Sequence, residues 1–191
     1  MQHPALLAAF RPAQWNRALA FDIALILTGS VVMIACAYLS FPLPFSPVPV
    51  SSQTFGVLLI GALLGSRRGA LAQLAYLSQG IAGLPVFAGG KFGLAHLLGP
   101  TGGYLIGFVV GAFVIGWLAE RGFDQHFKRA VQAMIVADVA IFSVGLAWLA
   151  YFVGGDRVLA AGLWPFLPGE IFKIALAATL LPIGWKVLRK F

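Results

Sequence analysis

The sequence predicts an all-α integral membrane protein with six transmembrane helices and both termini in the cytoplasm (N-in/C-in). Three observations predict it. Hydrophobic residues make up 60% of the 191 residues and charged residues only 10%, whereas soluble domains carry about a quarter charged residues. The apolar residues form six segments, and the basic residues gather in alternate connections between them. We expect a single transmembrane domain, residues 1–191, that begins with a cytoplasmic segment of about 19 residues.

Six apolar segments account for the predicted helices. They are residues 20–40, 54–65, 69–83, 104–119, 131–153 and 163–185. A span needs about 20 apolar residues, so the second and third segments are short. The second has 12 residues and would be about 18 Å long as a helix, too short to cross unless the Pro-rich segment before it also lies at membrane depth. Membrane proteins tend to build ligand sites from such short, Gly/Pro-interrupted segments.

The distribution of basic residues predicts the orientation. Ten of the thirteen Lys and Arg residues precede the first helix or follow the second, fourth or sixth: Arg11, Arg17, Arg67, Arg68, Arg121, Lys128, Arg129, Lys186, Arg189 and Lys190. The opposite loops hold only Lys91 and Arg157. By the positive-inside rule both termini are cytoplasmic, in a multi-pass protein of the cytoplasmic (inner) membrane surrounded by lipid. The net charge of +7 is spread between apolar segments, which argues against nucleic-acid binding.

The loops on the outer side are rich in Gly and Pro. Residues 41–52 contain four prolines and no charge. Because proline fixes its own backbone and restricts the residue before it, this segment is expected to be a stiff lid. Residues 83–90 and 99–103 contain two glycine clusters. Irregular backbone at membrane depth survives only where it is buried or lines a cavity, so these loops are either ordered walls of a small-molecule site or flexible connectors outside the membrane.

Two charged residues lie three positions apart in the sixth segment, Glu170 and Lys173. That spacing puts both on one face of a helix, and Pro165 and Pro168 place them near its outer end. Each costs roughly 2.5–3.5 kcal/mol at a helix centre. Two interpretations are open. The opposite charges only neutralise each other, which makes insertion of the helix into the membrane tolerable, or the pair offers a carboxylate and an ammonium to a ligand with a urea or amide group.

The remaining polar residues of the apolar segments and outer loops are weaker candidates: Gln53, Gln73, Gln79, His96, Thr101, Tyr104 and Asp138. Gln53 and Thr101 open predicted helices, whose free N–H groups suit a carboxylate. Asp138 lies deeper in the fifth helix, and we assign it to packing or coupling. A lone loop histidine and a single cysteine, Cys36, make no metal site. No nucleophile–base pair indicates catalysis.

The first helix carries small or slender residues at every fourth position: Ala20, Ala24, Thr28, Val32, Cys36 and Ser40. Such a ridge lets another helix approach closely. It either packs inside the protein or docks a partner subunit, for which Ala20, Ala24 and Thr28 are the candidates.

Four blocks in order resemble the BioY family, the biotin-specific substrate-binding (S) components of energy-coupling-factor (ECF) transporters. The blocks are PVPVSSQTF (47–55), GLPVFAGG (83–90), GPTGGYLIGF (99–108) and PFLPGEIFK (165–173). The resemblance implies a six-helix protein that captures biotin from outside. A transmembrane coupling subunit and a pair of ABC ATPases then drive uptake, in a cycle in which the S component topples in the membrane. No Walker A pattern occurs in this chain, so a partner must hydrolyse the ATP.

The resemblance also supplies a ligand for the polar residues. Biotin is the transported ligand rather than a cofactor, and the implied substrate-binding residues are Gln53, Phe87, Gly89, Gly90, Lys91, Thr101, Gly102, Gly103, Tyr104, Glu170 and Lys173. Glu170 would accept hydrogen bonds from the ureido N–H groups and Lys173 would donate to the ureido oxygen. Lys91 or the N-terminus of the fourth helix would face the carboxylate. Glu170 departs from the Asp that is common in the family, and Ser51 stands where Thr is frequent.

Other functions fit less well. An S component for another small vitamin would share the fold and differ only in ligand selectivity. A membrane-embedded enzyme would need a nucleophile–base pair or metal cluster, and a channel would need a polar pore, which these apolar helices do not offer. The sequence leaves open whether the protein works alone, as a homo-oligomer or only with ATPase partners.

Overall fold

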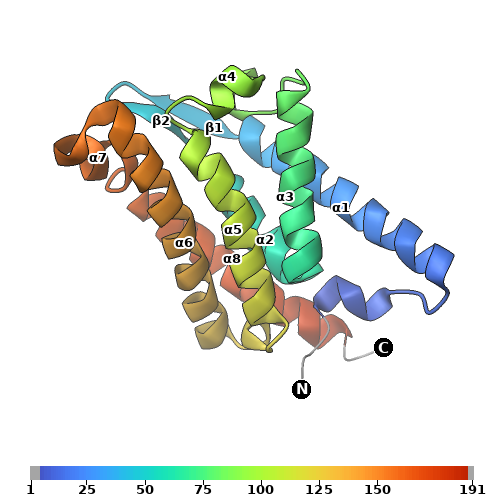
Figure 1. The fold of residues 1–191 in the computed structure, drawn as a ribbon. Coiled ribbons are helices and arrows are strands. Elements are labelled where there is room, and N and C mark those ends of the chain that lie inside the picture. Colours follow the sequence, from blue (N-terminus) through green and yellow to red (C-terminus); the bar gives the residue numbers. More distant parts are fainter. Residues whose placement is uncertain (1–4, 189–191) are drawn as a thin grey trace.

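The computed structural model describes residues 5–188 and is mostly helical (Figure 1). Its longer helices are α1 (Trp15–Tyr38), α2 (Gln53–Leu64), α3 (Ser66–Ile81), α5 (Gly102–Ala119), α6 (Phe127–Val153), α7 (Gly155–Gly162) and α8 (Leu167–Leu188). Shorter elements are η1 (Leu6–Phe10), η2 (Ala88–Gly90), α4 (Leu94–Leu97), η3 (Phe123–Gln125) and the strands β1 (Ser40–Leu43) and β2 (Ser46–Ser51). Six of these helices match the six predicted segments.

The helix boundaries differ from the prediction in several places. For example, α1 begins at Trp15 rather than at residue 20, and α6 begins at Phe127 rather than at residue 131. Arg67 and Arg68 were expected between two helices, but they lie in the first turn of α3. The chain turns from α2 to α3 at Gly65 alone, whose φ of 85° is a left-handed conformation that glycine adopts without steric cost. Likewise α8 begins at Leu167, four residues later than predicted, and α7 precedes it as a separate short helix.

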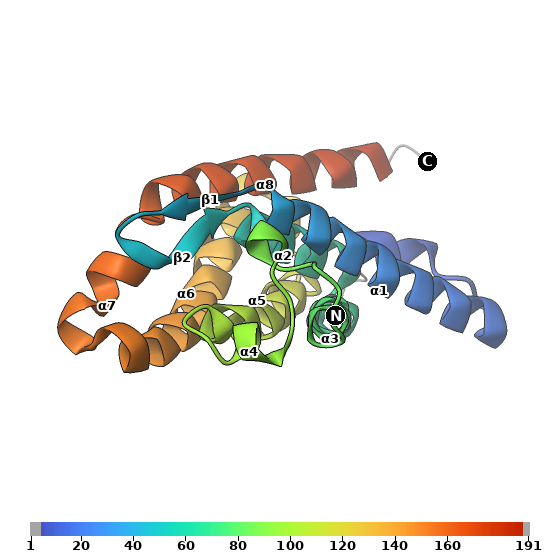
Figure 2. The same ribbon diagram turned by 90° about the horizontal axis from the view of Figure 1, so that it is seen from above.

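The Pro-rich segment is a β-hairpin, which corrects the prediction of an all-α protein. β1 and β2 pair antiparallel, with Phe41 opposite Val50 and Leu43 opposite Ser46. In a two-stranded sheet each strand is an edge, so a proline can occupy a position whose N–H is not needed for pairing. The Ser46 hydroxyl donates to the Ala161 carbonyl at 2.6 Å. Seen from above, the hairpin reaches from α1 to α7 (Figure 2).

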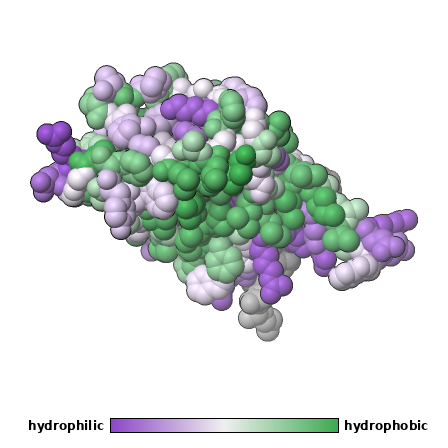
Figure 3. Space-filling model, turned by 45° about the horizontal axis from the view of Figure 1, so that its top comes forward, coloured by the Kyte–Doolittle hydropathy of each residue, from purple (hydrophilic) through white to green (hydrophobic). Residues whose placement is uncertain are grey.

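Within residues 5–188, four helices are long and apolar enough to cross a membrane: α1, α5, α6 and α8. α2, with 12 residues, and α3, with 16 residues, are shorter than the roughly 20 residues of a full span. A broad apolar surface runs across the face shown in Figure 3, and hydrophilic residues gather at its edges. Large apolar side chains such as Val139 of α6 and Ile171 of α8 are exposed, as expected for helices surrounded by lipid.

α5 lies at the centre of the bundle and contacts α2, α3 and α6. Three of its glycines, Gly103, Gly107 and Gly111, recur every fourth residue and face α6. A Cβ at Gly107 would lie 2.8 Å from the Ile141 carbonyl oxygen and 3.2 Å from its Cα. The two backbones can therefore approach this closely only because the side chain is absent.

The two ends of the bundle differ in charge. The hairpin, α4 and α7 lie at one end, while η1, η3 and the C-terminal end of α8 lie at the other (Figure 1). At that second end Asp22 of α1 bonds to Arg68 of α3 at 2.8 Å and to Arg11 at 2.9 Å. This cluster ties α1 and the segment before it to α3.

Replacing Gly107 by Ala should lower the melting temperature, because the new methyl group meets the backbone of α6 rather than a movable side chain. Overpacking of this kind costs about 1–3 kcal/mol. Cys36 is buried and is the only cysteine of the chain, so its reaction with a thiol-specific dye on heating reports unfolding directly. Gly155→Ala is the matched control, since nothing lies within 4 Å of a Cβ there. Equal melting temperatures for the two variants would contradict the packing argument.

Candidate functional site

A cavity opens beneath the hairpin, with about 520 Å³ of empty space that includes open solvent at its mouth. Its wall combines residues from β2, α2, α4, α5, α6, α8 and the loops between them: Val48, Pro49, Ser51, Gln53, Thr54, Ala88, His96, Thr101, Tyr104, Leu105, Phe108, Phe142, Phe166, Glu170 and Lys173. Segments far apart in the sequence therefore meet at one site.

One end of this cavity is charged and buried. Glu170 is 4% exposed, and its Oε1 accepts hydrogen bonds from Lys173 Nζ at 2.7 Å and from the Thr54 hydroxyl at 2.9 Å. Lys173 Nζ also donates to Thr54 Oγ1 at 2.8 Å. The three groups form a closed triangle between α2 and α8. Glu170 Oε2 has no hydrogen-bond partner among residues 5–188.

The wall beyond this triangle is aromatic. Tyr104 and Phe142 meet edge to face at 5.8 Å between ring centroids, and Phe142 meets Phe166 at 6.3 Å. The Tyr104 hydroxyl donates to the Gly162 carbonyl at 2.8 Å, so it is already satisfied by the protein. This wall can cover an apolar ring without competing for its polar groups.

The side-chain amide of Gln53 mainly connects elements around the cavity, because both its nitrogen and its oxygen are bonded to other parts of the protein. Its amide nitrogen donates to the Tyr76 hydroxyl at 2.9 Å, and that hydroxyl donates to the Val86 carbonyl at 3.2 Å. Its amide oxygen accepts from the Ser51 hydroxyl at 3.2 Å. This chain of bonds links the hairpin, α2, α3 and the 83–93 loop, which orders the loop over the cavity.

A second polar group on the wall is His96 of α4, whose Nε2 lies 3.2 Å from Thr101 Oγ1. Burial lowers the pKa of His96 below its ordinary value, and the nearby positive charge of Lys91 lowers it further. His96 is therefore neutral at pH 7, with one donor and one acceptor nitrogen, and the tautomer decides whether Nε2 donates to Thr101 or accepts from it.

The structure brings five of the eleven predicted substrate-binding residues to the cavity wall: Gln53, Thr101, Tyr104, Glu170 and Lys173. The other six lie behind or beside it. Phe87 is fully buried, between Tyr76 and His96. Gly102 and Gly103 pack against the Leu97 backbone and the Trp148 side chain. Gly89 and Gly90 each have a φ of 71°, in a turn closed by a hydrogen bond from Phe87 N–H to the carbonyl of the exposed Lys91.

Sequence reasoning missed the apolar half of the wall. Phe108, Phe142 and Phe166 line the cavity, but an apolar side chain in an apolar helix gives no signal of its position. Thr54 could have been found, because it follows Gln53 at the start of a short helix. Two of the weaker candidates, Gln73 and Asp138, are buried, and their side-chain oxygens and nitrogen have no hydrogen-bond partner within residues 5–188.

Metal binding finds no support in the part of the chain that the structure describes. No group of three or more His, Cys, Asp and Glu side chains there could hold a metal ion. The cavity wall carries one carboxylate, one ammonium and one neutral imidazole, besides the hydroxyl and amide groups of Ser51, Gln53, Thr54, Thr101 and Tyr104. These groups suit an uncharged polar ring or a small acid.

Comparison with known proteins agrees with this geometry. Residues 10–190 match the model of the BioY family. The chain is 38% identical over 179 residues to the biotin transporter BioY of Rhizobium etli, covering 87% of this chain and 96% of that protein. It is 38% identical over 152 residues to the biotin transporter BioY of Thermotoga maritima, covering 79% and 88%.

The fold is also similar to a solved structure. The crystal structure of the S-component for biotin from an ECF-type ABC transporter superposes with a TM-score of 0.79 at 28% sequence identity, covering 94% of this chain and 96% of that one. The family match spans nearly the whole chain, and each of these two relatives is identical at 38% of the aligned residues. This multi-pass membrane protein belongs to the BioY family.

Proposed function

We propose that this chain captures biotin at the outer face of the cytoplasmic membrane and delivers it as the S component of an ECF transporter. The observation that carries the proposal is the cavity, which has a charged, buried end at Glu170 and Lys173 and an aromatic wall. The names of its relatives support the same ligand. Biotin has the matching chemistry, a ureido ring with N–H donors and a carbonyl, an apolar thiophane ring and a carboxylate.

The cavity supports one orientation of the ligand. The ureido ring lies at the triangle of Thr54, Glu170 and Lys173, where a carboxylate oxygen and an ammonium N–H remain for it. The thiophane ring contacts the aromatic wall. The carboxylate then points toward the outer loops. There Thr101 and the neutral His96 are bonded to each other, so the one whose hydrogen is not used in that bond can donate to the carboxylate, and Lys91 contributes a positive charge near the mouth. No cofactor takes part in binding.

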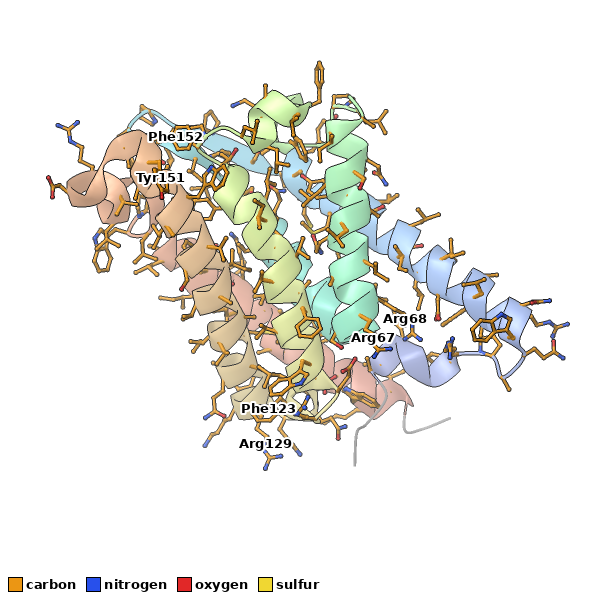
Figure 4. All side chains as sticks on the ribbon, in the orientation of Figure 1. Arg67, Arg68, Phe123, Arg129, Tyr151 and Phe152 are labelled. Atoms are coloured by element: carbon orange, nitrogen blue, oxygen red, sulfur yellow. The ribbon has the colours of Figure 1, made fainter. Side chains whose placement is uncertain are left out.

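The six-span, N-in/C-in topology is part of the proposal. The side chains of Arg67, Arg68 and Arg129 lie at one end of the molecule, and Tyr151 and Phe152 lie toward the other, in Figure 4. The Lys/Arg-rich end is cytoplasmic by the positive-inside rule. The cavity and its ordered Gly/Pro-rich loops then face outward, where free biotin arrives.

The proposed partners are a transmembrane coupling subunit and ABC ATPases. Ala20, Ala24 and Thr28 are all exposed on α1. Asp22 lies two residues from Ala20 and from Ala24, which is about 200° around a helix, and its bonds turn it toward α3. The small residues are thus on the opposite face, free for a close helix contact.

The charges of Glu170 and Lys173 should contribute strongly to the biotin affinity. The double variant Glu170→Gln/Lys173→Met removes both charges at similar volume, so it avoids leaving one buried charge unpaired. We expect a folded protein whose biotin affinity is lower by several kcal/mol, since each charge-assisted hydrogen bond contributes about 1.5–3 kcal/mol. Calorimetric titration in detergent measures it. Asp22→Asn/Arg68→Gln removes an ion pair remote from the cavity and serves as control. Wild-type affinity in the first variant would rule out this ligand orientation.

Topology is tested by labelling single cysteines in a Cys36→Ala background. A membrane-impermeant maleimide added to intact cells should label Arg157→Cys, in α7, and should spare Arg129→Cys, in α6, until the cells are permeabilised. The expected difference follows from the positive-inside rule. The reverse labelling pattern would overturn the proposed orientation.

A bulky residue on the small-residue face should block assembly and leave ligand capture intact. Ala24→Trp fills the groove that a partner helix would need, so pull-down of the coupling subunit should fail while the biotin titration stays unchanged. Val139→Trp, on the exposed face of α6, controls for the added indole in the membrane. A variant that loses biotin binding but keeps the complex would show that the ridge packs inside the protein.

A further inference from the structure

The hydrogen bonds of the charged triangle leave few free groups for a ligand. Glu170 Oε1 already accepts two hydrogen bonds, and the Thr54 hydroxyl both donates one and accepts one. An ammonium has three N–H donors, and two of those on Lys173 are used. What remains is one carboxylate oxygen, Glu170 Oε2, and one N–H of Lys173. Both residues line the cavity. Oε2 is itself buried and is without a hydrogen-bond partner within the described residues 5–188.

This pairing of one acceptor and one donor matches the N–H and C=O of a cyclic urea. It exists only while Lys173 is held on the Oε1 side of the carboxylate. The final torsion of a glutamate side chain has a broad energy minimum, so a Lys–Glu pair alone does not fix which oxygen is engaged. Thr54 supplies the missing constraint, because its hydroxyl bonds to both partners from a different helix, α2.

We propose that Thr54 is a specificity-determining positioning residue, which locks the Glu170 carboxylate so that Oε2 is presented to a ureido N–H of the ligand. The inference rests on the proposed function and names the atom through which the site selects its ligand. The Thr54 hydroxyl proton is used on Glu170 Oε1, and its oxygen accepts a hydrogen bond from Lys173. Thr54 therefore acts through Glu170 and Lys173.

The side-chain type suits this role. Thr54 is 8% exposed, and a β-branched side chain has few χ1 rotamers, so its hydroxyl keeps one direction. Without the hydroxyl, Lys173 and Glu170 each lose a partner, and the ammonium can swing toward Oε2 and compete with the ligand for it. The site would then still hold biotin against its aromatic wall, but it would distinguish ureido donors poorly.

The test compares biotin with the two analogues that carry a methyl group on one or the other ureido nitrogen. Each protein is titrated with all three ligands, and the ratio of the dissociation constants is the readout. Wild type should bind biotin more tightly than the analogue whose lost N–H faces Oε2. In Thr54→Val, which keeps the shape and removes the hydroxyl, biotin affinity should fall by about tenfold to a hundredfold, and the preference for biotin over that analogue should shrink.

Two further variants separate positioning from stability. Thr54→Ser keeps the hydroxyl and should retain most of the preference. Thr179→Val is the matched control, since Thr179 is on α8 and its hydroxyl bonds only to the Ala175 carbonyl of its own helix. Melting temperatures are measured beside each titration. If Thr54 had a purely structural role, Thr54→Val would weaken the binding of all three ligands equally and leave the ratio of their dissociation constants unchanged.

The outcomes distinguish this inference from the function on which it rests. If wild type fails to bind biotin, the proposed function falls. If wild type binds biotin and prefers it to the analogue, but folded Thr54→Val keeps the same ratio, the function stands and the role of Thr54 is overturned. A ratio reduced in Thr54→Val and kept in Thr54→Ser supports both.

Discussion

The buried ion pair between Glu170 and Lys173 is the interaction on which the site depends. A charge within apolar helices is tolerated only when it is paired and hydrogen-bonded. Here the pair lies on one turn of α8, and it draws in the Thr54 hydroxyl from α2. The polar end of the cavity is therefore also a tether between two helices. This arrangement leaves one carboxylate oxygen unsatisfied among the described residues, which a ligand N–H would satisfy.

Close helix packing fixes the rest of the wall. The glycines of α5 let α6 approach until backbone meets backbone, which places Tyr104 against Phe142. The hairpin and the 83–93 loop cover the opening and are held by hydrogen bonds through Gln53, Tyr76 and Ser46. The hairpin and this loop are thus ordered by polar contacts, whereas α5 and α6 beneath them are held together by close apolar packing. A small molecule between the two layers meets both kinds of surface.

Patterns of charge and hydropathy were enough to predict the helices and the charged end of the site. Glu170 and Lys173 stand out because a charge is rare in an apolar segment, and their spacing puts them on one face. The hairpin could not be predicted, because prolines indicate a stiff segment but do not indicate that residues 40–43 pair with residues 46–51. Phe142 and Phe166 were hidden for a different reason, since only tertiary packing decides which apolar residue faces a cavity. Phe87 and the glycines carried a strong motif signal, and the structure places them in the support of the wall rather than on it.

The central claim is the orientation of the ligand, with its ureido ring at the buried charge pair and its carboxylate toward the outer loops. An experimental structure of the protein with bound biotin tests it most directly. The account predicts ureido nitrogen and oxygen atoms within about 3 Å of Glu170 Oε2 and Lys173 Nζ. Biotin bound in the reverse direction, with its carboxylate on Lys173 and its ureido ring near His96 and Thr101, would contradict it.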